Sequence, residues 1–267
     1  MNQKTIKKVF KLGGVGIHSG KGVSILVSPA DDNHGIIFIK GGEKIPSILK
    51  SVNKTKRGTT LAGIAVVEHL LAAAYALGID NLNIEVSGDE IPAMDGSALL
   101  FTEAFLSSGI KEQNSEKNIL SVSRPDRVTD GKNFVEVLPY HGFKINFMVN
   151  FPGVGEQNFS FDLKSDSFKN EIAPARTFGY MEEYELLKEQ GLALGANMEN
   201  ALVLGKDGYV NTPRFPDEPV RHKILDLIGD LSLLGHPIEA EFNAVRSGHK
   251  LNTDLVHLLL KMDSADK

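Results

Sequence analysis

An internal repeat constrains the fold of this chain more than any other feature. The segment "VEHLLAAAYALGIDNLNIEV" at 67–86 aligns with "VRHKILDLIGDLSLLGHPIEAEF" at 220–242. Each begins with Val-x-His, continues as an apolar helix, breaks at a glycine (Gly78 and Gly235) and enters an alternating strand. The second helix is longer by about one turn. A chain that repeats helix, turn and strand in this order is expected to fold into two similar halves.

The segments on either side of these two units also correspond. Before them, "GVGIHSGKGVSILVSPA" and "LSVSRPDRVTDGKNFVEVLP" each predict a hairpin around a glycine turn. After them, each half has Ser-Gly, a loop and a helix, with Ser97 as one N-cap and Asn252 or Thr253 as the other. The sequence therefore predicts an α+β fold in which each half has an antiparallel-rich sheet with two helices packed on one face. The helices of the two halves are expected to face each other.

Residues 107–118, "SSGIKEQNSEKN", are polar and are interpreted as structureless. The predicted boundaries are 1–112 for the first α+β domain, 113–118 for the linker and 119–267 for the second α+β domain. The chain has 267 residues, of which 42% are hydrophobic and 24% charged. This length and composition allow well-buried cores.

Charge and composition exclude several classes of function. The net charge is −5 and the sequence pI about 5.9, so no overall field favours nucleic acid or an anionic membrane. The chain has no cysteine, which excludes disulfides and thiolate metal sites. The basic start, "MNQKTIKKVFKLGG", has no apolar core of signal-peptide length, and no apolar run approaches a membrane span. A cytoplasmic protein without stable membrane insertion is the expectation.

The helix predicted at 219–236, "PVRHKILDLIGDLSLLGH", carries a narrow ionisable stripe. Most of its residues are apolar, yet His222, Asp226 and Asp230 lie four residues apart, with Lys223 beside them. At ~100° per residue, these four groups fall inside an arc of about 100°. The stripe either faces water, as in an ordinary amphipathic helix, or lines a cleft where its charges need partners or a metal ion. The width of the apolar remainder favours the cleft.

A metal ion would explain the stripe. His222 and Asp226 can direct a nitrogen and an oxygen ligand at one divalent ion such as zinc. The repeat supplies a third ligand, because His69 occupies in the first half the position that His222 occupies in the second. Three ligands leave a fourth position open for water, the pattern of a catalytic zinc site. Glu68 is then a candidate general base; the alternative is that it only places a negative charge near a helix N-terminus.

Several longer motifs occur together between residues 14 and 252: "GVGIHSG", "VVEHLLAA", "IDNLNIEV", "EIPAMDGSA", "ARTFGYMEE", "EPVRHKILDLIGDL" and "SGHKLN". In sequence and order they resemble the UDP-3-O-acyl-N-acetylglucosamine deacetylases, the zinc amidases that commit Gram-negative bacteria to lipid A synthesis. The resemblance implies hydrolysis of the N-acetyl group of an acylated UDP-amino sugar, releasing acetate. It also implies one catalytic zinc ion, a small-molecule substrate and a monomer.

The resemblance assigns roles by position. The residues that match the family's zinc ligands are His69, His222 and Asp226. The residues that match its catalytic groups are Glu68 as general base, His249 as second catalytic group, Asp230 as the carboxylate that orients His249, and Thr177 as the hydroxyl that stabilises the oxyanion. The residues expected to bind substrate are Lys223, Phe178, His18 at the cleft edge and Arg246. Either Glu68 or His249 delivers the proton to the leaving amine.

Arg246 and Lys250 flank His249 and are basic candidates for the diphosphate, whereas their alternative role is ordinary surface charge. Without the resemblance, Phe178 is as readily a core residue and His18 a turn-capping residue.

The family also has an extra element in each half, which the resemblance places near 38–60 and, as a βαβ unit, near 180–204. The second element is expected to form an apolar passage for the acyl chain, with Leu192, Leu194 and Leu202 either as walls or as core residues. Gly63 stands where many relatives have cysteine.

Two other functions stay open from the sequence: a zinc amidohydrolase for a different N-acyl substrate, and a catalytically silent nucleotide-sugar binder. The presence of Glu68, His249 and Thr177 together argues against the binder, which needs none of them.

Overall fold

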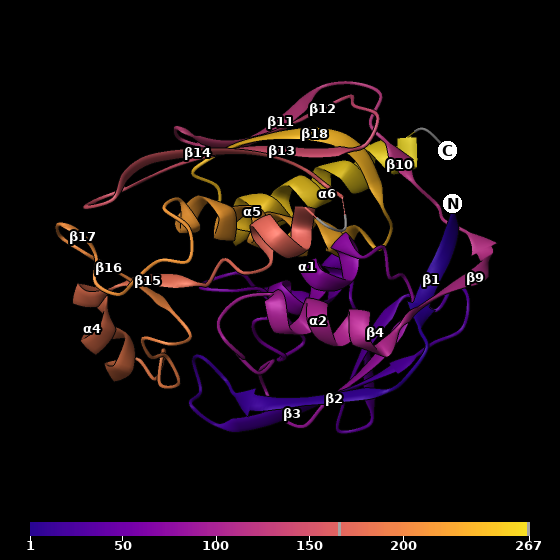
Figure 1. The fold of residues 1–267 in the computed structure, drawn as a ribbon. Helices are drawn as coiled ribbons and strands as arrows, with labels where there is room; N and C mark the ends of the chain where they lie inside the picture. The colour runs from indigo at the N-terminus through magenta and orange to yellow at the C-terminus, as the bar shows by residue number, and fades with distance from the viewer. Residues whose placement is uncertain (165–166, 266–267) are drawn as a thin grey trace.

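The computed structural model describes residues 1–164 and 167–265, and its elements form four layers (Figure 1). A sheet lies on each outer side, and the helices of the two halves lie between the sheets. These helices are α1 (Glu68–Ala76), α2 (Leu99–Ser108), α5 (Glu218–Leu231) and α6 (His249–Ala265). The 3-10 turn η4 (Ser232–Leu234) extends α5, and α1 packs against α5 at the centre. The predicted α+β fold, with helices facing each other, is confirmed.

The sheet of the first half has the strand order β2-β3-β8-β4-β5. Its strands are β2 (Phe10–Val15), β3 (Gly22–Pro29), β8 (Leu82–Val86), β4 (Ile36–Lys40) and β5 (Glu43–Pro46). The central strand β8 runs antiparallel to β3 and parallel to β4.

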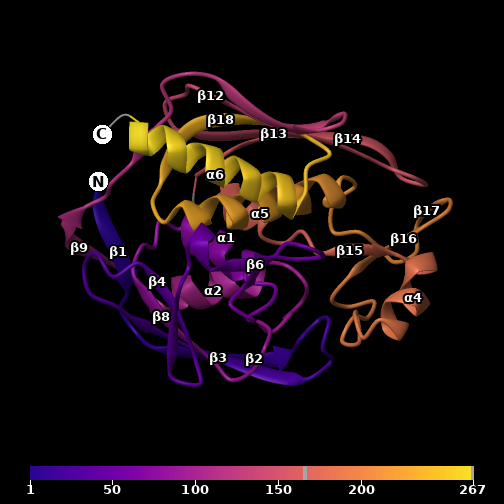
Figure 2. The same cartoon turned by 180° about the vertical axis from the view of Figure 1, so that it is seen from behind.

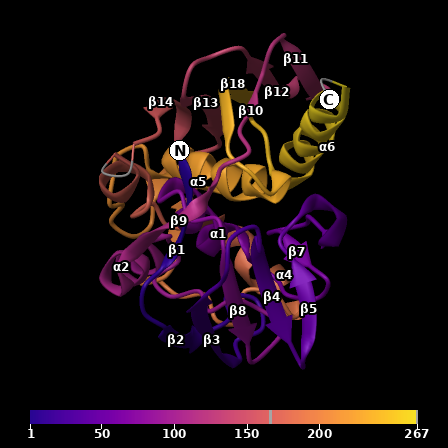
Figure 3. The same ribbon diagram turned by 90° about the vertical axis from the view of Figure 1, so that its right-hand side faces the viewer.

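The sheet of the second half repeats this order as β11-β12-β18-β13-β14 (Figure 3). Its strands are β11 (Asp126–Asp130), β12 (Asn133–Leu138), β18 (Ile238–Val245), β13 (Phe143–Phe151) and β14 (Gly155–Asp162). The central strand β18 runs antiparallel to β12 and parallel to β13, and the short β10 (Leu120–Ser121) also pairs with it. The two halves therefore match strand by strand, as the repeat predicts, and both predicted hairpins are present as β2–β3 and β11–β12.

Alternation along the strands produces the layers. In β18 every second residue is buried, including Ile238, Ala240 and Phe242, and the residues between them are half-buried. Successive strand side chains point to opposite faces, so one face of each sheet is apolar and is covered by helices. Figure 2 shows α6 lying beneath this second sheet.

The prediction of a structureless segment at 107–118 is wrong for most of its length. Residues Ile110–Glu116 form β9, which pairs antiparallel with β1 (Asn2–Ile6) at the start of the chain. The buried amide of Gln113 donates to the carbonyl of Ala30 and accepts from Asn81, so a polar residue fills an inward position. The segment is predicted to be structureless because its residues are polar, and polar composition alone does not exclude a strand. The domain boundaries at 112 and 119 stay a prediction.

The N-caps predicted for the second helix of each half are not the observed ones: α2 has Ala98 and not Ser97 at its N-cap, and Ala98 makes no side-chain cap hydrogen bond. The hydroxyl of Ser97 accepts a hydrogen bond from the backbone N–H of Leu99, the first residue of α2. In the other half, Asn252 and Thr253 are not N-caps either, because they lie inside α6, which begins at His249. The amide of Asn252 instead donates to Asp230 on α5.

Each half carries additional short elements. In the first half these are η1 (Leu49–Ser51), β6 (Val52–Lys54) and β7 (Thr60–Leu61). In the second half they are η2 (Phe168–Ile172), β15 (Phe178–Tyr180), η3 (Met181–Glu183), α4 (Tyr184–Glu189), β16 (Leu202–Gly205) and β17 (Gly208–Tyr209). β15 and β16 are parallel, with α4 between them in the chain, and this unit projects to one side of the layers (Figure 1). Among the described residues, no helix is both long and apolar enough to cross a membrane.

Candidate active site

A cavity of about 550 Å³ lies where the two halves meet. Its lining includes most of the residues singled out in the sequence: His18, Glu68, His69, Thr177, Phe178, His222, Lys223, Asp226 and His249. The ionisable stripe of α5 is buried, since Asp226 is 3% exposed and Asp230 0%. The stripe therefore faces a cleft and not bulk solvent.

A close helix crossing brings the two Val-x-His motifs together. A Cβ atom built at Gly229 on α5 would lie 2.2 Å from the backbone oxygen of Glu68 at the start of α1. Only glycine allows the two helix backbones to approach this closely. The rings of His69 and His222 consequently meet edge to face, with their centroids 4.9 Å apart.

His69, His222 and Asp226 fit a metal ion. Nε2 of His222 lies 3.3 Å and Nε2 of His69 3.8 Å from Oδ1 of Asp226, and all three ligand atoms are within 4.8 Å of one another. This Oδ1 atom is buried and has no hydrogen-bond donor among the described residues. A buried carboxylate oxygen without a partner is costly, and a cation at this position would satisfy it.

The protonation states of the three groups support the same reading. Burial lowers the pKa of His69 to about 3 and also lowers that of His222, so both imidazoles are neutral, as metal ligands must be. Burial by itself would raise the pKa of Asp226, but its interactions with the adjacent His222 imidazole and with the Lys223 ammonium hold it well below its usual range. Nδ1 of His222 donates to the carbonyl of Ala175 at 3.0 Å, which leaves Nε2 free to bind metal.

A second set of groups, Glu68, Asp226 and His249, is also close enough to hold an ion. Burial would lower the pKa of His249, but the charges of Asp230 and Asp226 raise it to about 9. A protonated imidazole has no lone pair to offer a metal. The first set, with two neutral imidazoles and one carboxylate, is therefore the better ligand set.

The carboxylate of Glu68 lies next to the metal-ligand set at the N-terminus of α1. Its Oε2 accepts a hydrogen bond from the backbone N–H of Thr59 at 2.9 Å, and its Oε1 lies 3.8 Å from Nε2 of His249. Burial raises the pKa of Glu68 to about 7. A carboxyl group with this pKa can exchange a proton near neutral pH, as a general base requires.

His249 and Asp230 form a buried pair behind Glu68. Nδ1 of His249 donates to Oδ2 of Asp230 at 2.8 Å, and the amide of Asn252 donates to the same oxygen at 2.8 Å. The contact that the sequence predicts between these two residues is present. It aims the other ring nitrogen, Nε2, at the cavity side occupied by Glu68 and Asp226.

The predicted substrate-binding residues are dispersed around the cavity. Lys223 donates to Oδ2 of Asp226 at 2.7 Å, and the ring of Phe178 packs edge to face on His222 with centroids 5.9 Å apart. His18 lies at the edge of the cavity, where its Nε2 contacts the carbonyl of Arg57 at 2.9 Å. Arg246 is exposed and does not line the cavity, so its role stays a prediction. Lys250 also lies outside and pairs with Asp254.

None of the three leucines considered as walls of an acyl passage lines the cavity, and the passage itself stays a prediction. Leu202 is fully buried in the core and Leu194 is 48% exposed; neither they nor Leu192 line the cavity. The apolar walls are formed by neighbouring residues of the same segment, including Leu187, Ala193, Ala196, Met198, Ala201 and Val203. The pattern of leucines could not show which side of an irregular segment faces inward.

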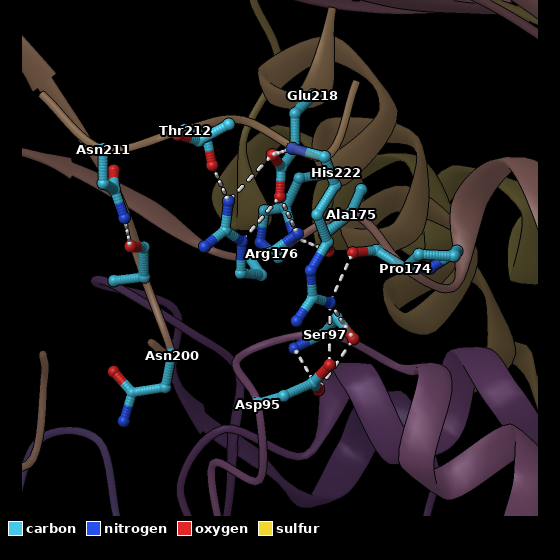
Figure 4. A network of polar contacts seen from close by, with 12 residues as sticks. Asp95, Ser97, Pro174, Ala175, Arg176, Asn200, Asn211, Thr212, Glu218 and His222 are labelled. Atoms are coloured by element: carbon cyan, nitrogen blue, oxygen red, sulfur yellow. Dashed lines mark hydrogen bonds and ion pairs between the residues drawn. The ribbon is translucent and has the colours of Figure 1, made fainter. Parts of the chain in front are cut away.

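Sequence reasoning missed a buried ion pair behind the site (Figure 4). Glu218 is fully buried and accepts hydrogen bonds from the backbone N–H and the guanidinium of Arg176 and from the backbone of Arg214. The Arg176 pair fixes the chain between Ala175, whose carbonyl contacts His222, and Thr177. The signal in the sequence that could have indicated this pair was one basic residue within "ARTF", Arg176, and one acidic residue at the start of "EPVRHK", Glu218.

Arg214 ties the same network to the first half of the chain. Its guanidinium donates to the carboxylate of Asp95 at 2.7 Å and to the carbonyl of Pro174 at 2.9 Å. The backbone N–H of Thr177 donates to the carbonyl of Gly96 at 2.7 Å. The segment that carries Thr177, just before β15, is therefore held from both halves of the molecule.

Comparison with known proteins identifies the family of the chain. The sequence model of the UDP-3-O-acyl N-acetylglycosamine deacetylase family matches residues 3–261. A protein of Syntrophotalea carbinolica named UDP-3-O-acyl-N-acetylglucosamine deacetylase is 39% identical over 270 residues, covering 97% of this chain and 87% of that protein. The resemblance inferred from the motifs is confirmed, and the chain belongs to the UDP-3-O-acyl N-acetylglycosamine deacetylase family.

Proposed function

We propose that this protein hydrolyses the N-acetyl group of UDP-3-O-acyl-N-acetylglucosamine, giving UDP-3-O-acyl-glucosamine and acetate in lipid A biosynthesis. One observation supports it above the others: two neutral histidines and an unpartnered carboxylate oxygen meet beside Glu68 and a cationic His249 in one cavity. Family membership supplies the substrate class.

His69, His222 and Asp226 would hold the metal ion, and zinc is the proposed metal because it accepts nitrogen and oxygen ligands in this combination. When bound, zinc would lower the pKa of water and polarise the amide carbonyl. The second oxygen of Asp226 stays with Lys223, whose ammonium lies 2.7 Å away. That contact orients the carboxylate so that Oδ1 faces the two histidines.

The protein's own groups then have separate tasks. Glu68, with a pKa of about 7, takes the proton of the attacking water. The hydroxyl of Thr177 donates to the oxyanion that forms on the amide carbonyl. His249 carries a positive charge beside the reacting centre because Asp230 and Asp226 raise its pKa to about 9, and it stabilises the negative charge that develops. Glu68 and His249 are the two candidates for protonating the leaving amine.

The remainder of the cavity suits the rest of the substrate. Apolar walls from residues 187–203 provide a surface for the 3-O-acyl chain. Binding energy from a remote acyl chain can position the amide at the reacting groups.

The experiment that tests this function is acetate release from the acylated UDP-amino sugar by the purified protein, together with its metal content. Stoichiometric zinc and steady acetate release are expected. Release from some other N-acyl compound alone would favour a different amidohydrolase, and binding without release would favour a silent nucleotide-sugar binder.

The variant His69→Ala tests the ligand set. It is expected to lose both zinc and activity, because one of three protein ligands is removed. Full zinc content in that variant would contradict the assignment. The monomeric state and cytoplasmic location expected from the sequence stay predictions.

A further inference from the structure

Thr59 touches both halves of the site but takes no part in the chemistry proposed above. It lies in the turn between β6 and β7 and is 1% exposed. Its backbone N–H donates to Oε2 of Glu68 at 2.9 Å, and its carbonyl accepts from Val67 at 3.2 Å, just before α1. Its hydroxyl reaches the other helix and donates to Oδ1 of Asp230 on α5 at 2.5 Å.

The preceding residue makes this position possible. Gly58 has φ +129°, a conformation that side chains rarely adopt, and a Cβ atom there would lie 3.0 Å from Oε1 of Glu68. The turn can therefore press closely against the Glu68 carboxylate. Thr59 follows within hydrogen-bond reach of both Glu68 and Asp230.

The Thr59 hydroxyl divides the oxygens of Asp230 between different donors. Oδ1 accepts from Thr59, whereas Oδ2 accepts from His249 and from Asn252, each at 2.8 Å. Asp230 is fully buried, so an oxygen that lost its donor could not turn to solvent. Oγ1 of Thr59 is also 3.4 Å from Nδ1 of His249, so the hydroxyl lies beside the contact between His249 and Asp230.

This division fixes the direction of the His249 ring. The terminal torsion of an aspartate side chain has a broad, two-fold energy profile, so the carboxylate orientation must be set by its donors. With Oδ1 held by Thr59, the ring bonds to Oδ2 and places Nε2 at 3.8 Å from Glu68 and 3.9 Å from Asp226. Without that donor, Oδ1 would compete for Nδ1 and the ring would have more than one orientation.

We infer that Thr59 is a positioning residue for the deacetylation: its hydroxyl holds the Asp230 carboxylate so that His249 faces the reacting centre. The inference rests on the proposed function. Thr59 does not line the cavity, so it acts through Asp230 and not through the substrate.

The variant Thr59→Val removes the hydroxyl and keeps the backbone contact to Glu68. Its kcat is expected to fall roughly 10- to 100-fold, with KM and zinc content unchanged. Thr59→Ser keeps the donor and is expected to restore kcat to within about threefold of the wild type. A matched control is Thr60→Val, because in the described part of the chain the neighbouring Thr60 hydroxyl makes no hydrogen bond to Glu68, Asp230 or His249. This variant is expected to keep its kcat.

A double-mutant cycle separates positioning from a general loss of structure. If Thr59 acts through Asp230, adding Thr59→Val to Asp230→Asn should cause little further loss of kcat. Fully additive losses, or a Thr59→Val enzyme as active as the Thr60→Val control, would overturn the inference. If the valine variant does not unfold cooperatively, Thr59→Ala replaces it in the same cycle, since alanine places no methyl group against Oδ1.

The same measurements distinguish this inference from the proposed function. If the wild type and the Thr60→Val control both fail to release acetate, the proposed function is wrong. If the wild type and Thr60→Val release acetate and Thr59→Val releases it at the same rate as they do, only the role inferred for Thr59 is wrong.

Discussion

Nδ1 of His249 lies 2.8 Å from Oδ2 of Asp230, and this contact joins the first residue of α6 to the last turn of α5. It explains why two aspartates on one helix have different neighbours. Asp226, one turn from His222, faces the two neutral histidines, whereas Asp230 faces a histidine from another helix. The ionisable stripe of α5 therefore contacts two separate groups of residues.

This separation predicts different defects for two similar substitutions. Asp230→Asn is expected to keep zinc and to lower kcat roughly 100-fold, because the histidinium loses its counter-charge. Asp226→Asn is expected to weaken zinc binding by roughly tenfold or more, because a ligand loses its charge. Zinc titration and steady-state kinetics of both variants check this. Loss of zinc in Asp230→Asn would contradict the division of roles.

The same pair predicts a pH dependence. The pKa of His249 is raised from 6.5 to about 9: burial opposes the shift, but the charges of Asp230 and Asp226 outweigh it. A group with a raised folded-state pKa adds stability below its unfolded pKa and loses it as the pH rises through the folded pKa.

The metal-free wild type should therefore have a larger free energy of unfolding than metal-free Asp230→Asn. This difference should be largest below about pH 6.5 and should shrink towards about pH 9. Urea unfolding of both proteins across that range measures the difference. The basic limb of the kcat/KM profile should also move to lower pH in Asp230→Asn. A difference in the free energy of unfolding that does not change with pH would show that Asp230 does not raise the pKa of His249.

Replacement of Glu68 by Gln should remove activity without removing metal. The amide can still accept the hydrogen bond from Thr59, but it cannot take a proton, so kcat should fall roughly 100- to 10,000-fold. Zinc content should stay at the wild-type level, because Glu68 is outside the proposed ligand set. Glu85→Gln, at an exposed position on β8, is the control. Near-normal kcat in Glu68→Gln would assign the base to another group.

The apolar walls of the cavity predict a dependence on the acyl chain. A substrate without the 3-O-acyl group should react at least roughly 100-fold more slowly in kcat/KM, since each buried CH₂ is worth about 0.8 kcal/mol. Ala201→Leu places a larger side chain in the wall and narrows the cavity, so it should lower kcat/KM more for long-chain substrates than for short-chain ones. Leu194→Ala, outside the cavity, should change neither. Equal kcat/KM for acylated and non-acylated substrates would exclude an acyl passage.

The buried Arg176–Glu218 pair predicts a combined defect. In Glu218→Gln, one amide group must replace a carboxylate that accepts from Arg176 and Arg214, so the protein should lose about 3 kcal/mol of stability. Zinc affinity should also fall roughly tenfold, because the Ala175 carbonyl that holds His222 is displaced. Urea unfolding and zinc titration measure the two effects.

The control for this variant is Asp217→Asn, which alters a partly exposed pair with Arg221 next to Glu218 in the chain. It is expected to cost less than about 1 kcal/mol. If both variants bind zinc as the wild type does, the network does not hold His222.

The sequence by itself determined the features that depend on short-range periodicity. The repeat of Val-x-His, helix, glycine and strand predicted two matching halves, and the sheets do match strand by strand. Helical spacing of His222, Asp226 and Asp230 identified one ionisable face, and the equivalent His69 completed a group of residues that could hold a metal ion. These patterns are readable because a helix or strand fixes which residues share a face before any tertiary contact forms.

Only the tertiary structure decided the features that join segments far apart in the chain. β9 is polar apart from Ile110 and becomes a strand because β1, at the other end of the first half, pairs with it. Thr59 lies in an irregular turn, and nothing in its neighbourhood indicates a contact with Asp230, 171 residues later. Likewise, Ala201 and not Leu202 lines the cavity, because Leu202 begins β16 and is buried in the core. In a segment without a regular period, the neighbouring residues do not indicate which way a side chain points. That direction is set by packing between segments that are far apart in the chain.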